Sequence, residues 1–452
     1  MQSFPRALTP VHVRAVAHAR PTPLATAVSA AVSKALSTAL HTALQTAPAL
    51  VLALAFVLTS GAALAQGAPA TLRPEIAPPL VAAQKALGDK QFDEALAQLR
   101  AADAVAGKTA YETYLVERLR FVAAAGKRDA PLALRSIEAA LATGQAEPEL
   151  RATLMDQASK TAYGLKDYER TVQWARRAIE AGATGSVTTL RLAQALYFQG
   201  QHPAAGQALD ALATRQRAAG EAPGEPQLRL QASNLLKMND DAGYAGVLED
   251  LLLAYPKPAV WSDRLARLSR QSGFDDRLML DLMRLGQRVQ AWETPQAQAE
   301  LVELALQAGF VNEARGYLDA AYAKGLLGQG PDAARHQTLR QRVQSLSAAD
   351  RAAGAPDARA LAARDAAFVF STGWDQYTAG RQPEGLALMQ QAVQRGLSKN
   401  PDDARLRLAG ALAASGQTEP ARAMLIAVRD AGHRDGLSDL ARLWLLQVPA
   451  PR

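Results

Sequence analysis

Short breaks between helix-forming stretches recur along this sequence at nearly constant spacing. They fall at Lys90, Gly126, Lys166, Gly200, Asn239, Gly273, Gly309, Gly380 and Gly416. The gaps are 36, 40, 34, 39, 34, 36, 71 and 36 residues, so the long gap corresponds to about two units. A period in the mid-thirties is typical of solenoids in which each unit is one helical hairpin. The spacing therefore predicts roughly ten stacked hairpins rather than two or three globular domains.

The stretches between the breaks have the composition and pattern of α-helices. Ala, Leu, Arg, Gln and Glu dominate residues 80–448, and apolar positions recur every three or four residues. Sustained alternation of Val, Ile or Thr is missing, so strands are not expected. We predict an all-α fold.

A second pattern follows each break. Five residues after it comes a small residue, then a bulky apolar residue four further on, and another apolar residue three beyond that. These positions are occupied by Ala95, Ala205 and Ala314, then Leu99, Leu209 and Leu318, then Ala102, Ala178, Leu212, Ala321 and Ala392. A small side chain allows the two helices of a hairpin to cross closely, and the later residues lie on the same helical face. Thr171, Gly385 and Pro420 depart from the pattern, so those units are distorted or the register is off by one.

These residues resemble the tetratricopeptide repeat over most of residues 80–448, although the Trp-x-x-Leu-Gly opening of that repeat is mostly lost. Tyr255-Pro256 and the turn from Asn400 to Asp403 fit the proline-containing link between its repeats. The resemblance implies a right-handed helical-hairpin solenoid that binds proteins or peptides. Within residues 255–328 stand the stretches Tyr255–Trp261, Ala305–Phe310 and Gly325–Gly328. Through them this segment also resembles a loose group of bacterial periplasmic proteins of this kind, some of which are linked to TonB-type energy-transducing systems.

The N-terminal 65 residues read as an export signal. Four basic residues and no acidic residue lie in this stretch, an apolar run spans Leu50 to Leu58, and Ala63 and Ala65 form an A-x-A cleavage site. The apolar core is too short to span a bilayer comfortably. We expect cleavage after Ala65 and a periplasmic or secreted protein without a later membrane span, while a retained anchor or a start codon assigned too early stays open. The formal charge then falls from +7 to +3, which removes the argument for a nucleic-acid partner.

The expected organisation has five parts. Residues 1–65 are a signal peptide, 66–79 a flexible linker, 80–328 an array of repeats, 329–357 a spacer or degenerate repeat, and 358–448 further repeats. The spacer contains a polar helix expected from about Asp332 to Leu346 and could serve as a hinge or as a packed degenerate hairpin.

The sequence offers no constellation that would support catalysis or metal binding. Cysteine is lacking, which excludes thiolate metal sites, a cysteine nucleophile and a lipoprotein anchor. Beyond the leader only His202, His336 and His433 remain, and none has metal-ligand spacing. Paired carboxylates such as Asp240-Asp241, Asp275-Asp276 and Asp402-Asp403 stand beside helix starts, where a capping role is expected. We therefore expect a non-enzymatic protein without a cofactor or a metal.

Partner-binding residues are expected on the first helix of each hairpin, which lines the concave face of such solenoids. Counting back from the breaks gives Lys160, Tyr163, Gln194, Tyr197, Arg267, Arg270, Trp374 and Tyr377. Tyr, Trp and Arg are favoured at binding hot spots, although a tyrosine at this spacing also suits the core between repeats. The stripe of Arg264, Arg267 and Arg270 could contact an acidic peptide or simply face solvent.

Two functions follow from these expectations. The first is a periplasmic scaffold that binds another envelope protein or peptide through its concave face, with a link to a TonB-type system implied by the resemblance. The alternative is an accessory protein that binds cell-wall glycan, because Trp and Tyr in a solenoid groove can stack on sugars.

Overall fold

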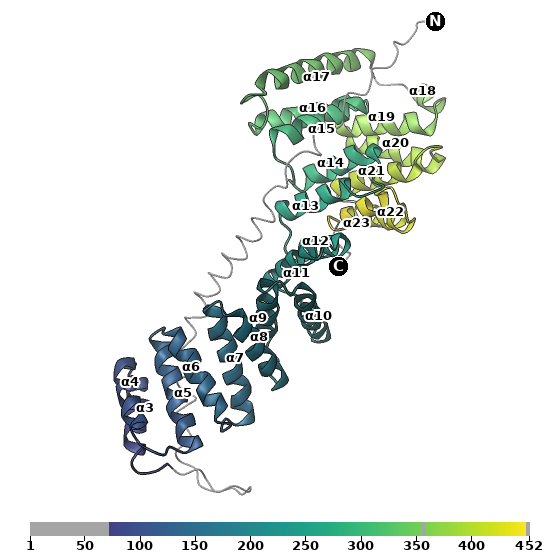
Figure 1. The fold of residues 1–452 in the computed structure, drawn as a ribbon. Helices are drawn as coiled ribbons and strands as arrows, with labels where there is room; N and C mark the ends of the chain where they lie inside the picture. The colour runs from purple at the N-terminus through teal and green to yellow at the C-terminus, as the bar shows by residue number, and fades with distance from the viewer. Residues whose placement is uncertain (1–71, 355–357, 449–452) are drawn as a thin grey trace. The chain divides into compact units, whose positions relative to one another are not determined.

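The structure is a computed structural model that describes residues 72–354 and 358–448, so the predicted signal peptide lies outside the described residues. The described chain divides into two compact units, residues 72–244 and 245–448, whose boundary falls within one helix. We call them the N-terminal unit and the C-terminal unit. Both consist of helices in successive antiparallel pairs (Figure 1). The described part holds no strand, and the all-α fold with tetratricopeptide-like hairpins is confirmed.

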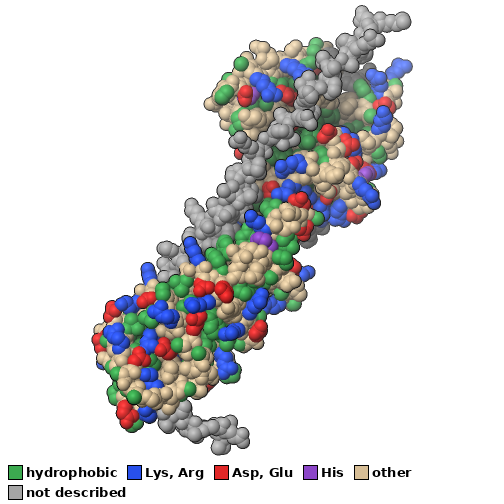
Figure 2. Space-filling model, viewed as in Figure 1, with side chains coloured by type: hydrophobic (Ala, Val, Ile, Leu, Met, Phe, Trp, Pro, Cys, Tyr) green, Lys and Arg blue, Asp and Glu red, His purple; other side chains and the backbone are tan. Residues whose placement is uncertain are grey.

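The N-terminal unit contains nine helices and the start of a tenth. They are α3 (Ala77–Gly88), α4 (Phe92–Asp103), α5 (Ala110–Gly126), α6 (Ala130–Ala142), α7 (Pro148–Gly164), α8 (Tyr168–Glu180), α9 (Ser186–Phe198), α10 (His202–Ala218), α11 (Glu225–Lys237) and α12 (Asp241–Ala254), which crosses the boundary. In Figure 2, basic and acidic side chains are intermixed over the visible face of this unit.

The C-terminal unit continues the series of helices. It contains α13 (Pro258–Ser269), the short 3-10 helix η2 (Asp276–Leu278), α14 (Met279–Arg288), α15 (Pro295–Gln307), α16 (Val311–Ala323), α17 (Ala333–Ala353), α18 (Ala358–Ala362), α19 (Ala366–Thr378), α20 (Gln382–Arg395), α21 (Pro401–Ala414), α22 (Thr418–Asp430) and α23 (Leu437–Leu445). Proline at the first position of α13, α15 and α21 suits a helix start, where its missing N–H costs no hydrogen bond.

The predicted breaks are the turns between helices. All of them except Gly126 have a positive φ, the left-handed conformation that ends a helix. Gly126 is still helical, and the left-handed residue is Arg128 at φ 61°. A Cβ on Gly126 would lie 2.3 Å from Cε1 of Phe92, so glycine is required there by a neighbouring ring rather than by a turn.

The small-residue pattern marks the crossing points of the hairpins, as expected. Its alanines and leucines are at most 2% exposed. Thr171 and Gly385 fill the buried position themselves, and the hydroxyl of Thr171 donates to the Asp167 carbonyl at 2.7 Å. At Pro420 the register was off by one, because Pro420 is exposed and Ala421 is the buried residue.

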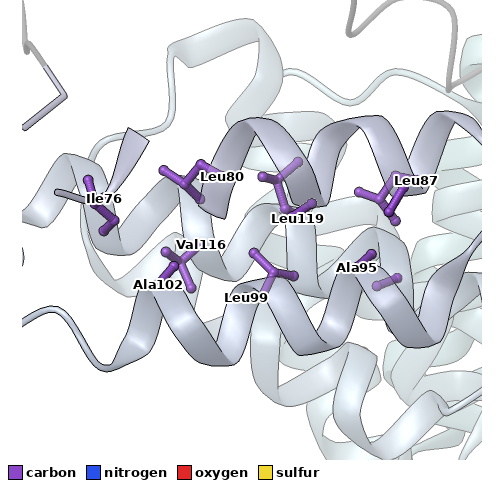
Figure 3. Close-up of a cluster of buried hydrophobic side chains, with 11 residues drawn as sticks. Ile76, Leu80, Leu87, Ala95, Leu99, Ala102, Val116 and Leu119 are labelled. Atoms are coloured by element: carbon purple, nitrogen blue, oxygen red, sulfur yellow. The ribbon is translucent and has the colours of Figure 1, made fainter. Parts of the chain in front are cut away.

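The first hairpin shows how these positions form a core. Leu80 and Leu87 of α3, Leu99 of α4 and Leu119 of α5 pack together with small alanines between them (Figure 3). Ile76, just before α3, is fully buried in the same cluster. The described part of the linker expected at 66–79 is therefore packed against the first hairpin, because it supplies an apolar side chain to this core.

An ion pair fixes the same segment. The guanidinium of Arg73 donates to both carboxylate oxygens of Glu112, which is fully buried at the start of α5. The Glu112 carboxylate also accepts from the backbone N–H of Thr109, whose hydroxyl in turn accepts from the N–H of Glu112. The hydrogen bonds from Arg73 and Thr109 lower the pKa of Glu112 to about 2.

This lowered pKa predicts an acid-sensitive contribution to stability. The contribution of Glu112 should be complete above its unfolded pKa, about 4.3, and should disappear as the pH falls toward 2. The Glu112→Gln variant should lack this pH-dependent contribution to the free energy of unfolding. Urea unfolding of both proteins from pH 6 to pH 2 should show a stability difference that shrinks with acidification, and a difference independent of pH would refute the assignment.

The segment expected as a spacer contains α17. Leu339 and Val343 of this helix are buried, and α17 packs on α15 and α16. The helix continues to Ala353, beyond the expected end near Leu346. Both sides of the expected spacer lie in the C-terminal unit.

Candidate binding cavity

A cavity of about 450 Å³ lies inside the C-terminal unit. Side chains from α14, α16, α19, α21 and α23 line it, so helices from four or more hairpins contribute to one site. Residues as distant as Asp281 and Trp444 therefore share its wall. Such a volume falls within the range of ligand pockets, roughly 300–1,000 Å³.

Arg284 of α14 is the central charge of this wall. Only 7% of the residue is exposed, and its guanidinium lies over the rings of Trp374 and Phe310, at 4.4 and 5.2 Å from their centroids. Its Nη1 donates to Asp281 at 2.5 Å, and its Nε and Nη2 donate to the two oxygens of Glu313 at 2.7 and 2.6 Å. A buried guanidinium requires such compensation, because an unpaired charge would be very costly there.

Glu313 of α16 is held by three neighbours. Besides the two bonds from Arg284, Oε1 accepts from the Tyr317 hydroxyl at 2.7 Å and Oε2 accepts from Nε1 of Trp374 at 2.9 Å. Glu313 is 4% exposed, and each of its carboxylate oxygens has two donors. Glu313 is therefore saturated and positions the aromatic side chains around it.

Asp281 links α14 to α21. Nε of Arg407 lies 2.9 and 3.0 Å from its two oxygens, and Nη2 of Arg407 lies 2.8 Å from Oδ2. Burial by itself raises the pKa of Asp281, but the charges of Arg407 and Arg284 outweigh burial and hold the pKa below the ordinary value. We call Asp281, Arg284, Glu313, Trp374 and Arg407 the cavity network.

A second set of ion pairs joins the same helices outside the cavity. Arg277 of η2 donates to Asp403 at the start of α21 at 3.0 Å and to Asp435, just before α23, at 2.5 Å. The backbone N–H of Asp275 also donates to the Asp435 carbonyl at 2.9 Å. These contacts bring residues more than 120 positions apart together and close the C-terminal unit around the cavity.

The paired carboxylates only partly follow the expected capping role. Asp240 and Asp275 accept from backbone N–H groups of the following turn, as expected. Asp402 and Asp403 do lie in the first turn of α21, but neither makes a side-chain cap. Asp403 binds Arg277 instead, and Asp402 contacts Nε2 of His433 at 2.8 Å, because tertiary partners compete for these oxygens.

Aromatic and small residues form another part of the wall. The Tyr377 hydroxyl donates to the Ala411 carbonyl at 3.2 Å, and Trp444 packs against Gly410, whose Cβ would lie 3.3 Å from the indole. Gly316 also lines the cavity, but a Cβ added there meets nothing within 4 Å. The space in front of Gly316 is therefore open.

The expected partner-binding residues separate into three groups, the third being Arg267 and Arg270 of the arginine stripe. Trp374 and Tyr377 lie in the cavity wall, and Trp374 is 6% exposed. The four from the N-terminal unit do not line this cavity: Lys160 is exposed, Gln194 is half-buried, Tyr163 packs on Tyr168, and Tyr197 packs on Phe198 and His202. Burial raises the pKa of both Tyr163 and Tyr197. Their ability to bind a partner stays a prediction.

The expected arginine stripe is not one continuous basic face. Arg264 is 2% exposed and pairs with Glu249 at 2.9 Å, so it belongs to the packing of α13. Arg267 is half-buried and pairs with Asp263, whereas Arg270 is exposed and donates to the Ala266 carbonyl. A stripe at every third position rotates around the helix, which is why its first member faces inward.

Most residues of the cavity network were missed because they lie on second helices. The sequence argument counted back from each break and thus considered only the first helix of a hairpin, whereas α14 and α16 are second helices. One signal was available: Asp281, Arg284 and Arg288 share one helical face that is otherwise apolar. In the described residues we find no group of acidic or histidine side chains arranged for a metal ion. None of the described helices is long and apolar enough to cross a membrane.

Comparisons with known proteins give only distant likenesses. No protein-family model matches the sequence, and no curated protein matches it. Among solved structures, the C-terminal part of a TPR repeat-containing protein from Cytophaga hutchinsonii is 13% identical, with 59% of this chain and 95% of that chain covered and a TM-score of 0.33. The TPR2AB domain of yeast Sti1 in complex with pHSP90 is 15% identical, with 60% and 98% covered and a TM-score of 0.32.

Proposed function

We propose that this array of tetratricopeptide-like hairpins is a non-enzymatic adaptor that binds a segment of another protein in the cavity of its C-terminal unit. The observation that carries the proposal is the cavity itself, which is open in front of Gly316 while the network beneath it is already paired. A wall of this kind is preorganised, so a ligand does not have to break ion pairs in order to enter.

The residues that line the cavity are better suited to binding a peptide than to catalysing a reaction. Glu313 and Asp281 have their oxygens occupied by fixed donors, so neither is poised to abstract a proton. Burial and the neighbouring Glu313 charge raise the pKa of Tyr317 well above its usual value, which keeps it a hydrogen-bond donor. The aromatic and small residues between these polar groups provide apolar area for side chains of a bound segment.

We place this adaptor in the bacterial cell envelope, with an envelope protein as its partner. The support is the export signal in residues 1–65 and the resemblance of residues 255–328 to periplasmic proteins of this kind. A link to a TonB-type system rests on that resemblance alone.

The cavity weighs against the cell-wall glycan alternative. Stacking on a sugar requires an open aromatic face, but the Trp374 ring is 6% exposed and Arg284 covers it at 4.4 Å. Trp374 therefore supports the charge network rather than a ligand-stacking platform.

Filling the cavity should abolish binding without unfolding the protein. Gly316→Leu places a side chain in the open space, whereas Gly246→Leu makes the same change on an exposed part of α12 where nothing lies within 4 Å. With a photoreactive benzoylphenylalanine at position 382, where exposed Gln382 lines the cavity, irradiation of intact cells should give an adduct with one envelope protein.

That adduct should be lost in Gly316→Leu and kept in Gly246→Leu, while both variants unfold at least as late in urea as the parent, because glycine is a poor helix former. An adduct of equal yield in all three proteins would mean that the cavity is not the binding site. The absence of any adduct in the parent would contradict the proposed function.

A further inference from the structure

The charged residues that line the cavity do not balance. Arg284, Arg288 and Arg407 contribute three positive charges, and Asp281 and Glu313 contribute two negative charges. The two carboxylates are fully engaged by Arg284, Arg407 and the aromatic donors. One positive charge among the three arginines is therefore not neutralised by a carboxylate of the cavity.

Arg288 carries that excess. It is exposed, it lines the cavity, and in the described part of the chain it makes neither an ion pair nor a hydrogen bond. Its guanidinium lies over the ring of Trp444 at 5.9 Å from the centroid. An arginine that rests on an aromatic face in this way is partly preorganised for a planar anion.

Arg407 adds donors on the opposite helix. Its Nε and Nη2 bind Asp281, while its Nη1 makes no hydrogen bond within the residues described. Arg288 on α14 and Arg407 on α21 thus both contribute unused N–H groups to the lining of one cavity.

We propose that Arg288 and Arg407 recognise the side-chain carboxylate of an acidic residue in the bound segment. This inference rests on the proposed function, because it assigns the chemical class of the peptide that the cavity takes. A lysine would be disfavoured, because it would meet Arg288 and the free Nη1 of Arg407, while Asp281 and Glu313 are already paired.

Three peptide libraries test this assignment with the full-length mature chain. Each consists of acetylated and amidated octapeptides with a fixed centre, Leu-Glu-Phe, Leu-Gln-Phe or Leu-Lys-Phe, so that only the central side chain differs in charge. The Glu library should bind about tenfold or more tightly than the Gln library, and the Lys library should bind more weakly still. Glutarate in large excess distinguishes a free small dicarboxylate from a peptide, because it should compete only weakly.

The variant Arg288→Gln should reduce binding of the Glu library to the level of the Gln library and leave the Gln library unchanged. Arg270→Gln is the matched control, since Arg270 is exposed in the same unit and does not line the cavity. Arg407 is not substituted, because its loss would leave Asp281 partly unpaired.

Equal binding of the Glu and Gln libraries would overturn the acidic preference but leave peptide binding intact. Failure of all three libraries to bind would instead overturn the proposed function, and tight binding of glutarate would replace the peptide with a small dicarboxylate.

Discussion

Arg284→Met is expected to lower the free energy of unfolding by about 3–5 kcal/mol, the cost of removing one member of a buried ion-pair network. The substitution leaves the Glu313 carboxylate at 4% exposure with only the Tyr317 hydroxyl and the Trp374 indole as donors. Asp281 would still have Arg407. The penalty therefore comes chiefly from the uncompensated charge of Glu313. Methionine fills much of the volume, so loss of packing contributes little.

Tryptophan fluorescence during urea unfolding measures the stability loss of Arg284→Met. It reports mainly on the C-terminal unit, because four of the five tryptophans lie there. The matched control is Arg270→Met, an exposed position that should change stability by less than about 0.5 kcal/mol. The double variant Arg284→Met with Glu313→Leu should recover part of the loss, since it removes the stranded carboxylate. A loss below about 1 kcal/mol for Arg284→Met, or no recovery in the double variant, would show that the network is not buried as described.

Gly385→Ala is expected to be destabilising by about 2–3 kcal/mol, although alanine is the better helix former. A Cβ at this position would lie 2.5 Å from the backbone nitrogen of Tyr377 and 2.6 Å from the carbonyl oxygen of Gly373. These are backbone atoms, which cannot turn aside as a flexible side chain can. Helices α19 and α20 would have to separate, and Trp374 and Tyr377 of the cavity wall lie on α19.

Gly246→Ala provides a control of opposite sign. Gly246 is also helical, but it is exposed and nothing lies within 4 Å of an added Cβ, so alanine should stabilise the protein by about 0.5–1 kcal/mol. Chemical denaturation of both variants measures the contrast. If Gly385→Ala were neutral or stabilising, the two helices would not cross as closely as the structure places them.

Much of the fold could be predicted from the sequence because hairpin repeats depend on local interactions. Gly309 ends a helix by its own backbone preference, whereas Lys166 adopts the same left-handed conformation at the equivalent turn; in both hairpins the small residue five positions later marks a crossing within the same hairpin. Even the apparent exception at Gly385 follows this rule, since glycine is an extreme case of a small residue. The sequence misplaced one turn at Gly126. Glycine stands there because the Phe92 ring of the preceding hairpin lies against it, and that contact could not be read from the sequence.

The cavity could be predicted only in part. Trp374 and Tyr377 stood out because aromatic residues on a first helix suggest a binding face. Asp281, Arg284 and Glu313 did not stand out, because charged residues on a helix are usually solvated and these sit on second helices. Arg407 and Asp281 are 126 positions apart, and no regularity of the repeat relates them.

The sequence by itself determined the repeat, the helical fold and the residues at each hairpin crossing, because those depend on contacts between neighbours in the chain. Only the tertiary structure decided that α14, α16, α19, α21 and α23 meet around one cavity, and which of the charges there are paired. The physical reason is that small rotations between successive hairpins accumulate. Over several hairpins these rotations place Arg277 of η2 beside Asp435, which precedes α23. The sequence of one hairpin cannot predict this ion pair.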